Sequence, residues 1–311
     1  MSTPIIKVTD ARYVYANGAV LALDGVSLEI PEGQSVGIVG QNGSGKTTLT
    51  KLLNGLLKPI SGSIVVDGKE TAKNTVQQMS STVGYVFQNP NHQLFATNVR
   101  AELAFGPTNL GLPPDEVARR VDEALVFFDI KQYAEMHPYR LSFPLRKLVG
   151  IASVFTMGPK VFVLDEPTTG LDPQARHLMW ERLQQLLQQG KSILLTTHFM
   201  DEAERLCDRL LVLDHGRKIA EGKPRDLIQE HLEPDVVEVF GGDPKHIASS
   251  AARSHAKRVE VSGDTVFFYT DTATPLLQAL GTTPGLRTLH RPANLEDLFL
   301  KLTGRQIRED G

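Results

Sequence analysis

Residues 40–47 have the sequence Gly40-Gln41-Asn42-Gly43-Ser44-Gly45-Lys46-Thr47, which matches the pattern G-x-x-x-x-G-K-[ST] at every position. Residues 34–39 predict a short buried strand before it, and the residues from Thr48 onward predict a helix after it. Glycine permits positive φ and close backbone approach, so successive N–H groups can point at phosphate oxygens. We expect Lys46 to reach the β- and γ-phosphates of a nucleotide and the Thr47 hydroxyl to bind Mg²⁺. The complete match favours a phosphate-binding loop over a glycine-rich turn with a surface lysine.

The composition is that of an ordinary globular protein, with 41% hydrophobic and 22% charged residues. A length of 311 residues predicts about two domains. The net charge of -3 argues against a broad nucleic-acid surface, so no nucleic-acid partner is expected. The single cysteine, Cys207, excludes an internal disulfide and favours a reducing, cytoplasmic compartment. We expect neither a signal peptide nor a membrane-spanning segment, so any membrane role would come through a partner.

Two side chains near the loop are open to more than one interpretation. Residues 4–8 and 26–30 predict strands of a β-rich front section, and Tyr15 between them could stack on adenine. The pattern alone favours a half-buried strand tyrosine instead. Residues 83–87 predict a buried strand, and Gln88 at its end could contact Mg²⁺ or orient a water molecule. A solvated glutamine is the alternative.

Acidic and histidine side chains follow two further apolar runs. Residues 160–164 predict a buried strand that delivers Asp165 and Glu166 to its carboxyl end. Buried carboxylates need a partner, which Mg²⁺ supplies for Asp165, and Glu166 suits a general base that polarises the attacking water. A capping acidic pair is disfavoured because a proline-containing loop comes next. Residues 192–197 predict a buried strand before His198, which could bond a γ-phosphate or a catalytic water or be structural.

The rest of the chain predicts helices and a second, smaller domain. Helices are predicted at residues 98–107, 114–133, 173–187 and 224–231. A further helix is predicted to run to about Met157, with Ser142 as its capping residue and Pro144 in its first turn. We place a domain boundary after residue 233. Beyond it, strands are predicted at 236–240, 258–261, 265–269 and 286–290, and helices at about 273–280 and 294–303. This alternation predicts a small α+β appendage.

These motifs, in this order and spacing, resemble the ATP-binding subunit of an ATP-binding-cassette (ABC) transporter over residues 4–230. The resemblance implies an α/β fold: a P-loop NTPase cassette at 4–233 with a β-rich front subdomain and a helical subdomain at about 90–158, then the α+β appendage at 234–311. It implies Walker A at 40–47, the Q-loop at Gln88, Walker B at 161–165, the catalytic Glu166, the D-loop at Leu171-Asp172 and the switch His198.

The same resemblance implies ATP and Mg²⁺ as cofactors. Mg²⁺ is expected to be held by Thr47, Gln88 and Asp165, and hydrolysis is expected to depend on Glu166, His198 and Gln88. The resemblance also raises Tyr15 above the strand interpretation, as the residue that stacks on adenine. The expected nucleotide-binding residues are Tyr15, Gly40, Asn42, Gly43, Ser44, Gly45, Lys46, Thr47 and Thr48.

In this family two subunits pair head to tail, so each ATP lies between one chain's Walker A and the other's signature motif. That signature is typically Leu-Ser-Gly-Gly-Gln, whereas this chain has Leu141-Ser142-Phe143-Pro144-Leu145. Ser142 can still donate to the partner's ATP, and Asp172 is expected at the dimer contact. Phe143 adds bulk and Pro144 lacks an N–H, so a heterodimer with a different ATPase subunit is favoured over a homodimer.

The two halves of the chain resemble different subfamilies. Residues 85–112 resemble energy-coupling-factor ATPases for cobalt, nickel or vitamin uptake, whereas residues 168–231 and 291–299 resemble exporter ATPases of the nodulation and drug-resistance type. In this family the Q-loop and the helical subdomain form the groove that holds the membrane-spanning subunit, and that surface is importer-like here. We therefore expect an energy-coupling-factor-type importer of a metal ion or vitamin, peripheral to the cytoplasmic face of the cell membrane. An exporter ATPase and a soluble non-transport ABC ATPase are the alternatives.

Overall fold

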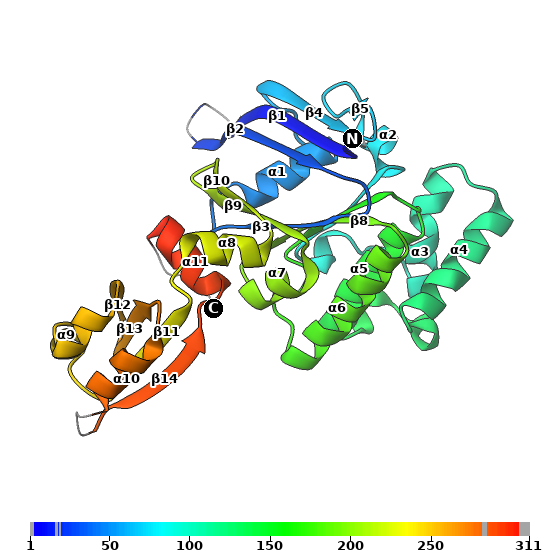
Figure 1. Cartoon of the computed structure of the whole chain (residues 1–311). Coiled ribbons are helices and arrows are strands. Elements are labelled where there is room, and N and C mark those ends of the chain that lie inside the picture. Colours follow the sequence, from blue (N-terminus) through cyan, green and yellow to red (C-terminus); the bar gives the residue numbers. More distant parts are fainter. Residues whose placement is uncertain (1–2, 16–17, 19, 282–284, 305–311) are drawn as a thin grey trace. The chain divides into compact units, whose positions relative to one another are not determined.

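The structure of the protein is a computed structural model that describes residues 3–15, 18, 20–281 and 285–304 (Figure 1). The chain divides into two compact units, Met1–Glu221 and Gly222–Gly311. Within the described residues, no helix combines the length and the apolar character needed to cross a membrane.

Six strands form the central sheet of the first unit, in the order β10-β9-β3-β8-β7-β6. Their bounds are β3 Ser35–Val39, β6 Val83–Val86, β7 Val161–Asp165, β8 Ser192–Thr197, β9 Arg209–Asp214 and β10 Arg217–Gly222. The five strands from β9 to β6 pair in parallel, and β3, β6, β7 and β8 are buried throughout, which explains their continuous apolar runs. Because β7, β8 and β3 are neighbours, their carboxyl ends bring Asp165, Thr197 and the loop after Val39 to one edge.

A second sheet has the order β2-β1-β4-β5 and is antiparallel. Its strands are β1 Ile6–Tyr15, β2 Val20–Ile30, β4 Ser61–Val66 and β5 Lys69–Glu70. Helix α1 (Lys46–Leu53) lies between the two sheets, and its Leu49 and Leu52 are fully buried in one core with Ile6 of β1 and Ile38 of β3 (Figure 1). The β-rich front section is therefore confirmed, and its packing on α1 holds the loop that precedes this helix.

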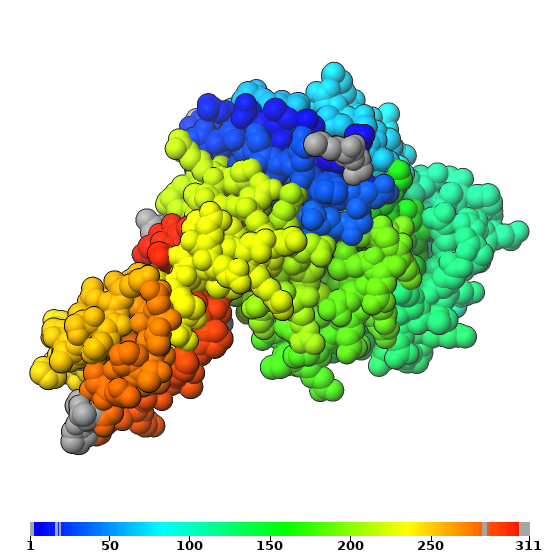
Figure 2. All heavy atoms as spheres, in the orientation of Figure 1, coloured from blue at the N-terminus to red at the C-terminus, as the bar shows by residue number. Residues whose placement is uncertain are grey.

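The helical segment contains α3 (Val99–Asn109), α4 (Pro114–Phe127) and α5 (Phe143–Phe155). In Figure 2 it lies in teal and green at one side of the first unit, away from the blue antiparallel strands. The helix predicted at 114–133 is too long, because α4 ends at Phe127 and Asp129 takes a left-handed φ of 55°. A 3₁₀ turn at Lys131–Tyr133 comes after it.

Helix α6 (Pro173–Gln188) agrees with prediction, whereas α2 (Val76–Ser80) and α7 (Met200–Leu206) were not predicted. Neither α2 nor α7 exceeds seven residues, which is too short to show a repeated apolar period.

The second unit is built on an antiparallel sheet in the order β12-β13-β11-β14. Its elements are α8 Pro224–His231, β11 Asp235–Phe240, α9 Pro244–Ala248, β12 Arg258–Ser262, β13 Thr265–Thr270, α10 Ala273–Leu280, β14 Arg287–Pro292 and α11 Leu295–Thr303. From β11 to β14 this is a βαββαβ arrangement of the ferredoxin-like type, so the α+β prediction is confirmed. The unit begins at Gly222 rather than after residue 233 as predicted, because α8 packs against α11.

Asp297 forms the polar centre of this unit. Its side chain is 1% exposed and accepts hydrogen bonds from Tyr269 (3.0 Å) and from Arg291 (2.6 and 3.0 Å). Asp297→Ala removes the buried acceptor that these two side chains share, so we expect the second unit to lose about 3 kcal/mol of unfolding free energy. Urea unfolding followed by circular dichroism measures this, while fluorescence of the single tryptophan, Trp180, follows the first unit. The exposed neighbour Glu296→Ala is the control; equal unfolding midpoints for the two variants would refute the role of Asp297.

Candidate functional site

The loop between β3 and α1 needs glycine at two positions for different reasons. Gly45 is the N-cap of α1 with φ of 105°, and a Cβ there would lie 2.5 Å from the carbonyl oxygen of Ala22. Gly40 does not take a positive φ. A Cβ at Gly40 would instead lie 2.4 Å from the carbonyl oxygen of Leu213, so close approach requires glycine there. Gly43 takes φ of 82° in open space and Asn42 is exposed.

Polar groups inside the loop fit a bound polyphosphate. Lys46 is 5% exposed, and its Nζ donates to the carbonyl oxygens of Gly40 (2.8 Å) and Gln41 (3.1 Å). Burial lowers the pKa of Lys46, and the carboxylates of Glu166 and Asp165 oppose that shift. The buried Ser44 hydroxyl makes no hydrogen bond within the described residues. A buried hydroxyl without a partner and an ammonium held only by carbonyls are both groups that phosphate oxygens satisfy.

Asp165, at the carboxyl end of β7, accepts hydrogen bonds from three hydroxyl groups. Its Oδ1 accepts from Thr47 (3.1 Å) and Thr196 (2.6 Å), and its Oδ2 accepts from Tyr85 (3.2 Å). The carboxylate and the Thr47 hydroxyl are hard oxygen ligands of the kind that Mg²⁺ takes beside phosphates, so this pair fits the predicted metal role. The hydroxyl of Tyr85 and that of Thr196 are contacts that motif reasoning missed, since each comes from a strand position predicted only as buried.

Glu166 lies beside Asp165 and is surrounded by the other predicted catalytic side chains. Its Oε2 accepts from Gln88 Nε2 (2.9 Å) and Thr169 Oγ1 (3.1 Å), and lies 3.5 Å from His198 Nδ1. Gln88 therefore donates to Glu166 through its Nε2, and its role toward Mg²⁺ stays a prediction. Although burial raises it, the pKa of Glu166 lies below its usual value because His198, Lys46 and Thr169 favour the carboxylate. A carboxylate held in its charged form suits a hydrogen-bond acceptor for water.

Tyr15, at the end of β1, contacts the first turn of α1. Its hydroxyl lies 3.1 Å from Thr48 Oγ1, and its ring packs edge-on against Tyr13 with centroids 5.0 Å apart. The side chain is 38% exposed, which leaves ring surface accessible beside the loop. Stacking on adenine stays a prediction for Tyr15.

Ser142 and Asp172 are the residues from which α5 and α6 begin. Ser142 is the exposed N-cap of α5, but its hydroxyl makes no capping bond, so that prediction was wrong in this detail. Pro144 lies in the first turn of α5, as predicted. The residue directly after the cap is Phe143, whose side chain prevents the close backbone approach that a glycine at this position would allow. Asp172 caps α6 by accepting from the Ala175 N–H (2.9 Å). The roles of Ser142 and Asp172 toward a second chain stay predictions.

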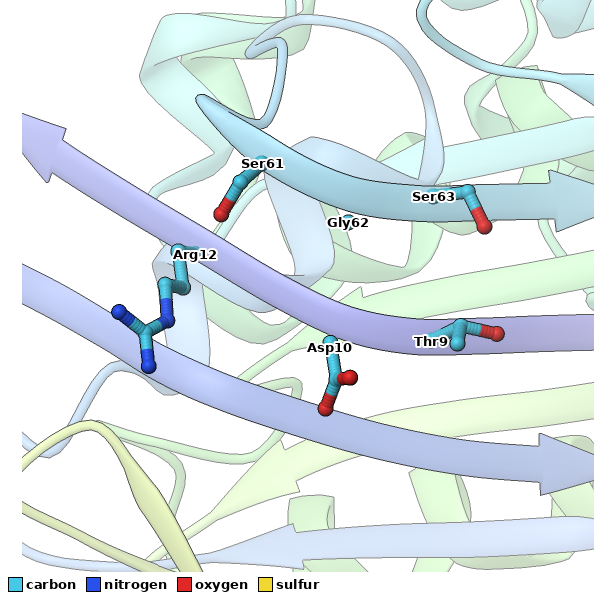
Figure 3. A pocket seen from close by; sticks show the side chains of 6 residues that line it. All are labelled: Thr9, Asp10, Arg12, Ser61, Gly62 and Ser63. Carbon is cyan, nitrogen blue, oxygen red and sulfur yellow. The ribbon is translucent and has the colours of Figure 1, made fainter.

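A separate cavity of about 510 Å³ lies on the antiparallel sheet (Figure 3). It is lined by Thr9, Asp10, Arg12, Ser61, Gly62 and Ser63, from β1 and β4. The Nη2 of Arg12 lies 3.4 Å from Oδ1 of Asp24, and Oδ1 of Asp10 accepts a hydrogen bond from Ser27. Both charged side chains of the cavity therefore already have partners. None of the predicted site residues lines this cavity, and it has no part in the candidate site.

Two family models and several known proteins are similar to this chain. Residues 23–169 match the model of the ABC transporter family, and residues 245–304 match that of the nodulation factor export protein NodI, C-terminal domain. The Nod factor export ATP-binding protein I of Cupriavidus metallidurans is 44% identical over 99% of this chain and 100% of its own length. The protein of the same name from Ralstonia nicotianae is 45% identical over 99% of this chain and 96% of its own length.

Two solved structures are similar as well. The cbiO1 protein of Clostridium perfringens, described as part of the ABC transporter complex cbiONQ, covers 74% of this chain and 92% of its own, with 38% identity and a TM-score of 0.68. The dimeric ATP-binding cassette MJ0796, in a post-hydrolysis state bound to ADP and Pi, covers 70% of this chain and 98% of its own, with 25% identity and a TM-score of 0.64.

Proposed function

Because the chain belongs to the ABC transporter family as an ATP-binding subunit, we propose that it hydrolyses ATP to drive export through a separate membrane-spanning subunit. One observation carries the proposal of hydrolysis. Glu166, Gln88 and His198 meet at one carboxylate oxygen, beside the pair formed by Asp165 and Thr47. That arrangement places an acceptor for water next to a site for the terminal phosphates.

Each residue then has a defined task. The backbone of the loop and Lys46 bind the phosphates of ATP, and Tyr15 holds the adenine. Mg²⁺, with Thr47, Gln88 and Asp165 as its proposed ligands, would supply positive charge against the phosphate oxygens. Glu166 accepts a hydrogen bond from the attacking water, while Gln88 and His198 fix the direction of its carboxylate.

The direction of transport is supported by the whole-length relatives. The importer that residues 85–112 led us to expect has less support than the exporter alternative, because relatives named for Nod factor export match 99% of this chain. The match of residues 245–304 to the NodI C-terminal domain also favours export. The likeness to cbiO1, at 38% identity, covers 74% of the chain. We therefore propose export, with the chain held peripherally at the cytoplasmic face of the membrane.

We propose that the chain works as half of a head-to-tail pair with a second ATP-binding subunit. The dimeric state of MJ0796 supports pairing as such. Phe143 and Pro144 occupy the first turn of α5, where glycine N–H groups would otherwise face the partner's nucleotide. A partner subunit with two glycines at these positions would complete the site around the ATP that this chain binds, so we favour a heterodimer.

The proposed docking surface for the membrane subunit centres on two exposed aromatic side chains. Phe95 and Phe105 are 60% and 48% exposed and pack edge-to-face with ring centroids 4.6 Å apart. Gln93 ties this segment to α5 through the Gly150 carbonyl oxygen (2.7 Å). The double variant Phe95→Ser/Phe105→Ser should lower the amount of membrane subunit that co-purifies with the tagged chain about tenfold, because aromatic anchors dominate such interfaces.

Ile219→Ser is the matched control for this experiment, since Ile219 is 40% exposed on β10, at the opposite edge of the sheet from β6. The wild-type complex, analysed by mass spectrometry, also tests the function itself. An export permease supports the proposal, and a coupling subunit with substrate-binding partners supports the importer. Recovery without any membrane protein would favour the non-transport ATPase, and a second, different ATPase subunit would support the heterodimer.

A further inference from the structure

Lys147 is a buried lysine of α5 that has no role in the motifs described so far. Its side chain is 4% exposed, and its Nζ donates a hydrogen bond of 2.9 Å to the backbone carbonyl oxygen of Glu166. Burial lowers the pKa of Lys147 to about 8, against the opposing influence of Glu202, Glu166 and Asp165. A long cationic side chain is seldom buried to this extent without a specific partner, so the contact with Glu166 needs an explanation.

The backbone of Glu166 is in a conformation that needs support. Its φ of 46° lies in the left-handed region, which non-glycine residues seldom adopt. The N–H of Glu166 donates to Thr196, at 3.1 Å to the carbonyl oxygen and 3.0 Å to Oγ1. The carbonyl oxygen of Glu166 accepts from Lys147 on the other side of the same residue. The two contacts hold the backbone of Glu166 on both sides, directly after the end of β7.

Phe143 covers this contact. It precedes Lys147 by four residues, so both lie on one face of α5, and the Lys147 Nζ is 5.5 Å from the centre of the Phe143 ring. The ring also lies against the loop after Glu166, because a Cβ built on Gly170 would be 3.2 Å from its Cε1. Excluding water from a charged hydrogen bond strengthens it.

We propose that Lys147 is a positioning residue that fixes the backbone of Glu166, and that Phe143 shields this contact from water. The inference rests on the proposed function, in which Glu166 orients the attacking water. Phe143 stands where the signature motif typically has glycine, and this proposal gives it a role within its own chain, as the cover of Lys147. Ser142, the N-cap of α5, is expected to face the partner's ATP, so Lys147 on the same helix also links that end with this chain's own Glu166.

Lys147→Met tests the proposal in the full chain, purified with its membrane subunit. Methionine keeps the length and apolar stem of the side chain but cannot donate. We expect kcat for ATP hydrolysis to fall about tenfold and KM to change less than about twofold, because misplacing the base affects the chemical step and not binding. Lys147→Arg, which can donate to the same carbonyl oxygen, should recover most of the lost kcat.

Lys191→Met is the matched control, since Lys191 Nζ also donates to a backbone carbonyl oxygen, that of Pro159 (3.0 Å), in the same unit. It should leave kcat unchanged. In the Glu166→Gln background, Lys147→Met should cause no further loss of kcat, because both changes act through one group. A further tenfold loss there, or an unchanged kcat for Lys147→Met alone, would overturn the inference. If Glu166→Gln itself leaves kcat unchanged, the proposed function fails instead.

Phe143→Gly gives a second route that leaves Lys147 in place, in case Lys147→Met does not fold. Opening the contact to water should lower kcat about threefold, as expected when a shielded charged hydrogen bond becomes exposed. If Phe143 only impairs the site that it offers to a partner, restoring glycine should raise kcat. An unchanged or increased kcat therefore contradicts the shielding role.

Discussion

Glu166→Gln is expected to lower ATP turnover about 100- to 1000-fold while ATP stays bound, because the amide cannot take a proton or hold water as strongly as the carboxylate. The wild-type carboxylate accepts from Gln88 and Thr169 at Oε2. The carbonyl oxygen of glutamine can accept the same bonds, so the variant should keep the shape of the site. The loop at 40–47, which is proposed to bind the phosphates, is untouched by the change.

Steady-state hydrolysis and nucleotide binding should be measured on the same preparation. The expected pair of results is lost turnover with a dissociation constant for ATP within about threefold of the wild type. An ATP-bound dimer should accumulate, because hydrolysis no longer reopens it. Glu204→Gln, an exposed glutamate on α7, is the control and should hydrolyse ATP normally. Equal turnover of Glu166→Gln and wild type would show that another group orients the water.

Lys46→Ala should weaken ATP binding about 100-fold, because a charged hydrogen bond to a phosphate contributes about 1.5–3 kcal/mol and the loop loses its internal contacts as well. In the structure Lys46 is buried and bonds to the carbonyl oxygens of Gly40 and Gln41. Alanine removes both the contact that Lys46 is proposed to make with the phosphates of ATP and the hydrogen bonds that pre-organise the loop.

Titration with a fluorescent ATP analogue measures this effect directly. Lys51→Ala is the control, since Lys51 is in the last turn of the same helix α1. Its removal changes the net charge by the same amount, so a loss of affinity in both variants would indicate general electrostatics and not the specific contact. Unchanged affinity in Lys46→Ala would contradict the phosphate-binding role of the loop.

Sequence reasoning succeeded where local pattern and chain order determine the outcome. The apolar runs at 161–164 and 193–195 predict buried strands, and parallel strands place the residues after them at one edge. That rule is sufficient to bring Asp165, Glu166 and His198 near the loop at 40–47. It is not sufficient to decide which of them touch, and the contact of Gln88 with Glu166 is one that the strand pattern does not record.

From sequence alone come the glycine-rich loop at 40–47, most of the strands and helices around it, and the residues delivered to the edge of the sheet. Periodicity encodes whether a side chain is buried, and motif spacing encodes which residues come directly after a strand. The partners of buried polar groups follow from the packed fold, such as Lys147 with the Glu166 carbonyl oxygen and Tyr85 with Asp165. Those pairs join residues 19 and 80 positions apart in the chain. Such contacts depend on how separate elements pack, which no local pattern records.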